Sequence, residues 1–350
     1  MLNIWRLEAD IAARMAAARV PGLALAVVGG GEVIYARGFG VTSVEDGGLP
    51  VTPYTLFQIG SITKSLTGTL VMRLVDAGAL DLDRPVTAYL PDLTLGQPDV
   101  AGRVTLRRLL SHTAGLPFDQ ITPDRLYGSR DPDALAAYVR DELPRRPLVA
   151  APGARWSYSN PGIILAARVA EVVTGRTYPE LLRELVCAPL VMARTTVDPT
   201  VALTYPLAQG HELAEDGALR VRHRAADNAA QYPAAFAYST ALDLANFALL
   251  HLGGGRFGGE RVLTPASVAA MHEPHAARGE GPGTAYGLTF FLDDFRGRRK
   301  VGHPGSVAPY ASLLALLPDE GLGVVLLCNR GDDFEAEREV IADAILADLL

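Results

Sequence analysis

The strongest constraint on the fold of this 350-residue chain is that strand-like segments stand at both of its ends. The apolar runs with this character are residues 23–28, 32–37, 286–292, 310–317 and 323–328. Turn residues at 29–31 and 318–321 leave short connections between neighbouring runs. Strands joined by short turns pair antiparallel, so we expect one antiparallel sheet that is assembled from both chain termini.

A stretch with helical spacing of its apolar residues, from Ser61 to about Leu252, separates the two sets of strands. Both terminal segments show the same helical spacing. We therefore predict an α+β fold in which helices flank the sheet and a large, mostly helical lobe is inserted into it. The expected division is an α/β lobe of residues 1–60 plus 283–350 and a helical lobe of residues 61–282, with the active site at their boundary.

The composition argues against several classes of function. The formal net charge of −7 argues against a nucleic-acid partner, because nucleic acid is usually bound by a basic face. The short basic cluster at residues 296–300 is interpreted as a solvated hairpin turn. No apolar run is long enough to span a bilayer, and nothing in the sequence specifies an oligomeric state. The first ten residues lack the pattern of a signal peptide, so we expect a cytoplasmic protein, or a secreted one if a signal has been removed.

We expect no disulfide framework, no metal and no cofactor. Two distant cysteines, Cys187 and Cys328, do not form such a framework. The three glycines at 29–31 precede a strand rather than a helix, which argues against a phosphate-binding loop. Residues 272–275 read His-Glu-Pro-His, but the spacing of the histidines and the proline do not fit the zinc-protease motif.

Ser61 and Lys64 form the first signal of catalysis, a Ser-x-x-Lys motif at the start of a helix-patterned segment. Residues i and i+3 of a helix share a face, so the Lys64 amine is predicted to point at the Ser61 hydroxyl. The free N–H groups at a helix start favour developing negative charge. A serine needs a base to become a nucleophile, and a lysine held neutral by burial or by a neighbouring positive charge can be that base. Alone the motif is weak, since a chain of this length contains about one by chance.

Tyr158-Ser159-Asn160 is the second signal, in a loop before a helix that we expect to begin at Ile163. In an extended loop, side chains two residues apart can point the same way. The Tyr158 phenol can relay protons, and the Asn160 amide can bind an amide or ester substrate. Ordinary turn chemistry is the alternative interpretation of these residues.

The third signal is the run from Gly302 to Ser306, which reads Gly-His-Pro-Gly-Ser and is placed between a charged turn and a strand. Gly305 would let a substrate approach the backbone closely. The Ser306 N–H could then donate to an oxyanion beside the N–H of Ser61. The alternative is a plain hairpin in which His303 is a satisfied polar residue.

In their order and spacing, these three motifs resemble those of the class C-type β-lactamase and penicillin-binding-protein-like serine hydrolases. That family includes β-lactamases, D-amino-acid-specific peptidases and carboxylesterases. The similarity extends over nearly the whole chain, and the segments that carry it are residues 50–64, 109–117, 152–160, 239–245 and 303–305. It implies a mechanism in which a serine is acylated, the leaving group departs and water hydrolyses the acyl-enzyme.

The resemblance also implies a role for each matching residue. Ser61 is the expected nucleophile. Lys64 and Tyr158 share the acid and base roles, with the first proton acceptor left open between them. Asn160 is expected to contact the substrate, and His303 to support Tyr158 or the far end of the substrate.

The run His303-Pro304-Gly305 departs from the Lys-Thr-Gly that the family has at this place. A neutral histidine and a proline, which has neither hydroxyl nor N–H, offer less to a substrate carboxylate. We therefore expect a carboxylesterase that acts on a small ester or amide. The alternatives are a D-amino-acid-specific peptidase, a β-lactamase, and a non-catalytic sensor that binds peptidoglycan-like or β-lactam ligands.

Phe236 and Tyr238 stand where many relatives have smaller residues. Two interpretations remain open for them: they line an acyl pocket, or they pack in the core.

Overall fold

The computed structural model describes residues 2–96, 99–118, 125–281, 283–331 and 334–350. Its strands are β1 (Gly22–Gly29), β2 (Glu32–Gly40), β3 (Phe57–Gln58), β4 (Gly210–Leu213), β5 (Leu219–Arg222), β6 (Tyr238–Ser239), β7 (Arg256–Phe257), β8 (Glu260–Arg261), β9 (Ala276–Ala277), β10 (Ala285–Tyr286), β11 (Phe291–Phe295), β12 (Arg298–Val307), β13 (Tyr310–Leu317) and β14 (Leu322–Cys328). Its α-helices are α1 (Ile4–Ala17), α2 (Ile62–Asp76), α3 (Leu106–Leu110), α4 (Ala134–Ala137), α5 (Asn160–Thr174), α6 (Tyr178–Leu182), α7 (Pro199–Ala202), α8 (Tyr232–Ala235), α9 (Ala241–Leu252), α10 (Pro265–His272) and α11 (Glu335–Leu349).

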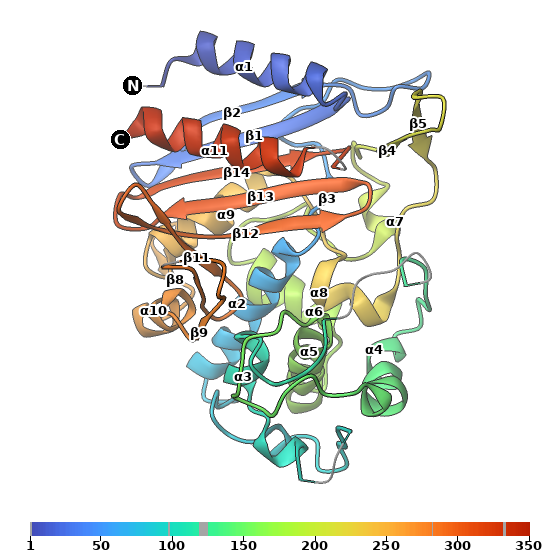
Figure 1. The fold of residues 1–350 in the computed structure, drawn as a ribbon, viewed down its shortest axis with the longest axis vertical. Coiled ribbons are helices and arrows are strands. Elements are labelled where there is room, and N and C mark those ends of the chain that lie inside the picture. The colour runs from blue at the N-terminus through green and yellow to red at the C-terminus, as the bar shows by residue number, and fades with distance from the viewer. Residues whose placement is uncertain (1, 97–98, 119–124, 282, 332–333) are drawn as a thin grey trace.

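The main sheet has eight strands in the order β2-β1-β14-β13-β12-β11-β10-β9, and each neighbouring pair is antiparallel. The two ends of the chain meet in its middle, where Leu23 of β1 lies opposite Cys328 of β14. Both termini lie at the same end of the molecule (Figure 1). The predicted α+β fold with a sheet built from both termini is confirmed.

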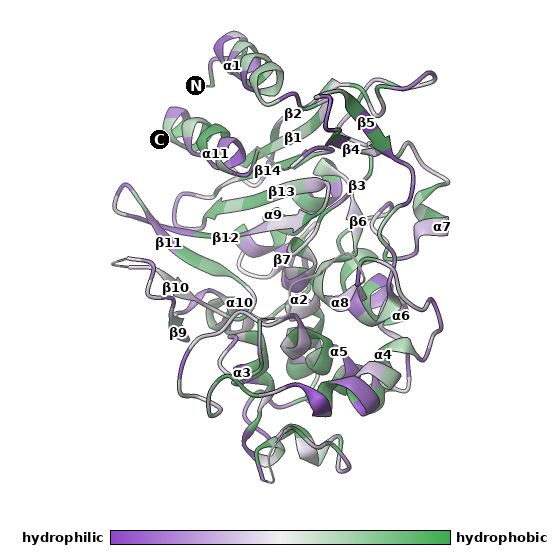
Figure 2. Cartoon of the chain, turned by 45° about the vertical axis from the view of Figure 1, so that its right-hand side comes forward, coloured by the Kyte–Doolittle hydropathy of each residue, from purple (hydrophilic) through white to green (hydrophobic). Residues whose placement is uncertain are grey.

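Helices cover both faces of this sheet, and strand β1 shows why. Its side chains alternate between two hydrophobic clusters, as the pleat requires. Leu23, Leu25 and Val27 face α1 and α11, whereas Ala24 and Ala26 face the larger core that continues into α2 and α9. Each large aliphatic side chain buried in this way contributes roughly 1.5–3 kcal/mol. The strands β13 and β14 are therefore strongly hydrophobic along their length (Figure 2).

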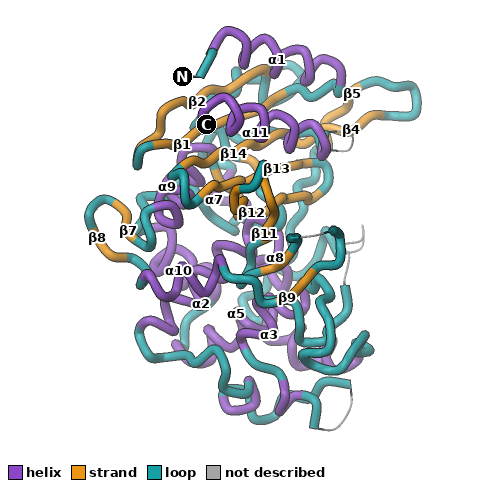
Figure 3. Tube along the Cα trace, turned by 60° about the vertical axis from the view of Figure 1, so that its left-hand side comes forward, coloured by secondary structure: helices purple, strands orange, loops and turns teal. Residues whose placement is uncertain are grey.

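The middle of the chain forms the second, mainly helical layer (Figure 3). Helix α2 is buried on nearly all sides, so its sequence is apolar or small almost throughout. Two elements of the middle segment nevertheless belong to the sheet layer: α9 packs on β1 and β14, and β9 extends the sheet. The division at residues 60 and 283 stays a prediction.

Two sequence-based boundaries are wrong. Residues 286–292 do not form one strand, because β10 ends at Tyr286 and β11 begins at Phe291. Between them Thr289 has φ = 63° and donates its N–H to the Leu110 carbonyl at 2.9 Å, a long-range contact that strand periodicity does not reveal. The run 302–306 was placed between a charged turn and a strand, but it lies inside β12. Proline is tolerated there because β12 pairs with β11 only as far as Gly302, which leaves an open edge.

Both cysteines are buried and unpaired. Within the part of the chain that the structure describes, no helix combines the length and the apolar character that crossing a membrane requires.

Candidate active site

The start of α2 brings Ser61 and Lys64 together. Gly60 has φ = 50°, a left-handed conformation that glycine adopts without strain, and this turn delivers Ser61 to the N-cap of the helix. One helical turn later, Lys64 Nζ lies 2.9 Å from Ser61 Oγ. Ser61 remains partly exposed, so a substrate can reach its hydroxyl. The predicted proximity of the two side chains is present in the structure.

Lys64 is fully buried at 0% exposure. Its amine donates to the carbonyl of Ala234 at 2.7 Å and lies 4.8 Å from the centre of the Tyr158 ring. No carboxylate of the described residues pairs with this amine. Burial without a counter-ion disfavours the charged form and lowers the pKa of Lys64 well below its ordinary value of 10.5. The amine is thereby prepared to accept a proton.

Tyr158 approaches Ser61 from the loop before α5, close enough for the Ser61 hydroxyl to act on the pKa of its phenol. Burial of the phenol raises the pKa of Tyr158 above its ordinary value, which keeps the hydroxyl protonated. Helix α5 begins at Asn160 rather than at Ile163, because Ser159 caps it through the N–H of Gly162 at 3.2 Å. Asn160 is therefore a buried residue of the first turn and not part of the loop.

Strand β12 lies against the turn that carries Ser61. A side chain on Gly305 would stand 2.1 Å from the Ile59 carbonyl oxygen, and one on Gly60 would stand 2.5 Å from the Ser306 nitrogen. Glycine at both positions therefore allows the strand and the turn to touch. The backbone of exposed Ser306 is thus brought beside the turn that ends at Ser61.

His303 lies on the open edge of β12 and is buried at 1% exposure. Its Nε2 is 3.2 Å from the Tyr286 hydroxyl oxygen, and its Nδ1 is 2.6 Å from the Pro304 carbonyl oxygen. Burial, assisted by nearby Lys64, lowers the pKa of His303 to about 3. The side chain is neutral at pH 7, so it supplies no fixed charge for a carboxylate.

A group of aromatic rings that sequence reasoning missed surrounds Tyr158. The centre of its ring is 4.4 Å from that of His112 and 6.1 Å from that of His303. Tyr286 and Phe291 continue the group, with their ring centres 4.9 Å apart. The only signal of His112 in the sequence is its place in the segment 109–117, which the family resemblance covers.

Phe236 and Tyr238 are each 1% exposed. Phe236 belongs to the main hydrophobic core, and Tyr238 lies in β6 opposite Gln58 and packs against Leu56 and Ala202. This packing favours the core interpretation of both residues over the acyl pocket.

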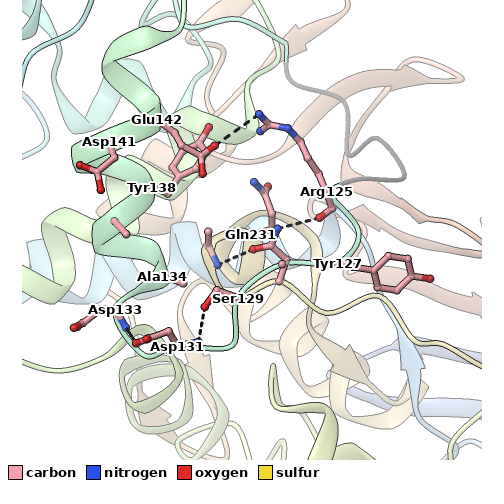
Figure 4. Close-up of a pocket in the computed structure, with 14 residues that line it drawn as sticks. Arg125, Tyr127, Ser129, Asp131, Asp133, Ala134, Tyr138, Asp141, Glu142 and Gln231 are labelled. Atoms are coloured by element: carbon pink, nitrogen blue, oxygen red, sulfur yellow. Dashed lines mark hydrogen bonds and ion pairs between the residues drawn. The ribbon is translucent and has the colours of Figure 1, made fainter.

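A separate cavity of about 490 Å³ lies between α4 and the segment before α8 (Figure 4). Its described lining includes none of the residues of the three motifs. Acidic side chains surround it, and Arg125 is paired there with Glu142 at 3.9 Å. Among the residues that the structure describes, no cluster of three or more His, Cys, Asp or Glu side chains could hold a metal ion.

Comparison with known protein families gives a match over nearly the whole chain. The family model Beta-lactamase covers residues 7–347. Penicillin-binding protein 4 of Amycolatopsis lactamdurans is 35% identical over 319 residues, which are 89% of this chain and 81% of the relative. Protein flp of Staphylococcus aureus is 25% identical over 318 residues, and this chain spans 61% of its length.

Solved structures agree. The octameric penicillin-binding protein homologue of Pyrococcus abyssi superposes with a TM-score of 0.84 at 29% identity, over 99% of this chain and 77% of that one. A class C beta-lactamase of Rhodobacter sphaeroides gives a TM-score of 0.77 at 27% identity, over 98% of this chain and 99% of the other.

Proposed function

We propose that this chain, which belongs to the Beta-lactamase family of serine hydrolases, cleaves small esters or amides through an acyl-enzyme on Ser61. The proposal rests on one distance above all: Lys64 Nζ lies 2.9 Å from Ser61 Oγ. A neutral amine at that distance can take the hydroxyl proton and make the serine a nucleophile.

In the acylation step, Ser61 Oγ attacks the substrate carbonyl carbon while its proton passes to the Lys64 amine. The carbonyl oxygen becomes an oxyanion, for which the N–H groups of Ser61 and Ser306 are the proposed donors. Tyr158 is the proposed donor of the proton that the leaving group takes as the bond to it breaks. Its raised pKa keeps this proton available, and Lys64 then returns a proton to Tyr158.

Deacylation reverses these roles. A water molecule loses a proton to the neutral pair of Lys64 and Tyr158 as its oxygen attacks the acyl carbon. The ester bond to Ser61 breaks, and the serine oxygen takes the proton back. Asn160, at the first turn of α5, is the proposed contact for the substrate's acyl side.

We further propose that esters are better substrates than β-lactams. A penicillin or cephalosporin carries a carboxylate that must be held while the ring opens, and neutral His303 and Pro304 offer it neither charge nor hydroxyl. A charge-assisted hydrogen bond contributes about 1.5–3 kcal/mol, so its absence corresponds to roughly ten- to hundredfold in rate. The names of the relatives favour a second candidate, a penicillin-binding peptidase or β-lactamase.

The nucleophile is tested with a serine-directed phosphonate and Ser61→Ala. One addition at Ser61 and almost complete loss of turnover in Ser61→Ala are expected, because this hydroxyl alone carries the acyl group. Ser65→Ala is the matched control: the side chain lies in the same helix but bonds the Thr289 carbonyl at 2.8 Å. Labelling at another serine, or near-normal turnover in Ser61→Ala, would refute the acyl-enzyme.

Substrate preference is tested by comparing kcat/KM for a short-chain aryl ester and a chromogenic cephalosporin. The wild type should prefer the ester, and His303→Lys with Pro304→Thr should gain relative activity on the cephalosporin if melting shows that it is folded. A wild-type preference for the cephalosporin would instead support the second candidate.

A further inference from the structure

We propose that His112 is a positioning residue that holds the Tyr158 hydroxyl against Ser61. This inference rests on the proposed role of Tyr158 as a proton carrier. His112 lies in the connection after α3, 46 positions before Tyr158, and belongs to none of the three motifs from which the site was first assigned.

The backbone of residues 112–115 is hydrogen-bonded to the loop that carries Tyr158. Three N–H groups of the loop donate to carbonyls of this segment: Val149 to Gly115 at 2.9 Å, Gly153 to Thr113 at 2.7 Å, and Ser157 to His112 at 2.8 Å. Because backbone bonds fix the course of both segments, the loop cannot shift without breaking them.

His112 binds the N–H groups of the two residues that flank Tyr158. Its carbonyl accepts from the Ser157 N–H at 2.8 Å, and its Nδ1 accepts from the Ser159 N–H at 3.1 Å. These two bonds hold the chain immediately before and immediately after the tyrosine. The backbone of His112 has φ = 57°, which is uncommon for a residue with a side chain.

The His112 ring also supports the Tyr158 ring directly. The two ring centres are 4.4 Å apart, and the centre of the His112 ring also lies 4.8 Å from that of Tyr286. Nδ1 can accept from Ser159 only when it carries no proton, and burial lowers the pKa of His112, which keeps the ring neutral. The buried Nε2 has no hydrogen-bond partner among the described residues. A buried nitrogen without a partner is unfavourable. The contacts of the ring with Ser159 and Tyr158 therefore have to outweigh this cost.

The requirements at this position are a left-handed backbone, an acceptor for the Ser159 N–H and an aromatic ring. Asparagine fulfils the first two, because it tolerates the left-handed region and its amide oxygen can accept. Glycine fulfils only the first. Both variants keep the backbone conformation and lack the ring, so comparing His112→Asn with His112→Gly isolates the contribution of the hydrogen bond.

The test is a double-mutant cycle with Tyr158→Phe, in which kcat and KM are measured with an aryl ester. His112→Gly should lower kcat about ten- to hundredfold with KM nearly unchanged, since small displacements of a catalytic group have effects of this size. His112→Asn should recover most of the loss. In the Tyr158→Phe background, His112→Gly should change kcat less than about twofold, because the hydroxyl that it positions is already absent.

Thr113→Ala is the matched control, since its side chain bonds Ser111 at 2.9 Å in the same segment and should leave kcat unchanged. An equal fractional loss in both backgrounds, or a normal kcat in His112→Gly, would overturn the inference. If His112→Gly does not fold, the same cycle is measured with His112→Asn, whose smaller loss of kcat should again disappear in the Tyr158→Phe background.

Phosphonate labelling of Ser61 in the wild type separates the two proposals. Failure of labelling contradicts the acyl-enzyme, whereas normal labelling without coupling between His112 and Tyr158 contradicts only the role of His112.

Discussion

Lys64 and Lys300 are the two lysines of the chain. They differ in whether carboxylates lie beside the amine. Lys64 stands in α2, fully buried, with a hydroxyl and a carbonyl as its hydrogen-bond partners. Lys300 stands in β12 with 14% of its side chain exposed, 2.6 Å from Asp343 and 3.1 Å from Glu339 of α11. Burial alone would lower the pKa of Lys300, but the two carboxylates outweigh it and raise that pKa.

The contrast teaches that burial alone does not decide the charge of a lysine. What decides it is whether carboxylates accompany the amine into the interior. With them, Lys300 remains a cation that attaches α11 to the sheet. Without them, burial lowers the pKa of Lys64 and favours the neutral amine beside a serine, which is the form that a general base requires.

The largest expected effect is that of removing the Lys64 amine. Lys64→Ala should lower kcat/KM by roughly two to four decades, the scale of a general acid–base group. Lys64→Arg should be equally inactive, because a guanidinium stays protonated. Lys300→Arg is the matched control and should retain normal kcat/KM. An active Lys64→Arg variant would mean that the region around Lys64 needs a positive charge, and the contrast between the two lysines would be lost.

Variants of Tyr158 test whether Lys64 acts in a shared proton path, because the two residues are proposed to carry the same proton. Tyr158→Phe should also lower kcat/KM by roughly two to four decades. In a double variant with Lys64→Ala, the loss should be close to that of the more damaged single variant. If kinetic measurement gave the product of the two single losses, the residues would act independently.

The smallest expected effect is that of Lys300. Lys300→Met should lower the free energy of unfolding by about 1 kcal/mol at neutral pH and leave kcat unchanged, because the partner carboxylates are partly exposed. A raised pKa means that this contribution is complete at neutral pH and lost only when the pH rises through the pKa of folded Lys300. Urea unfolding of both proteins measures the difference, and an equal stability would show that the ion pairs contribute nothing.

Local patterns predicted much of this molecule. The antiparallel sheet from both termini followed from apolar runs with short turns, and the proximity of Ser61 and Lys64 followed from helical spacing. The helix start at Asn160 was missed by three residues, although Ser159 and the following Asn-Pro are typical of a capped helix.

Local patterns did not predict contacts between residues that are far apart in the chain. The basic cluster at 296–300 was interpreted as solvated, yet Lys300 is paired with a residue 43 positions away. The bond from Ser159 to His112 spans 47 positions, and that from Thr289 to Leu110 breaks an apparent strand. Tertiary structure decides these placements, because the partner of each residue is absent from its neighbourhood in sequence.

The protonation state of Lys64 is the most direct test of the account. Because the chain has two lysines, a protein with isotope-labelled lysine gives two side-chain NMR signals, and Lys300→Arg assigns them. The account predicts that Lys64 is neutral at neutral pH and titrates well below 10.5, whereas Lys300 stays charged beyond that value. A Lys64 signal that remains charged at neutral pH and titrates near or above its ordinary pKa would contradict the account.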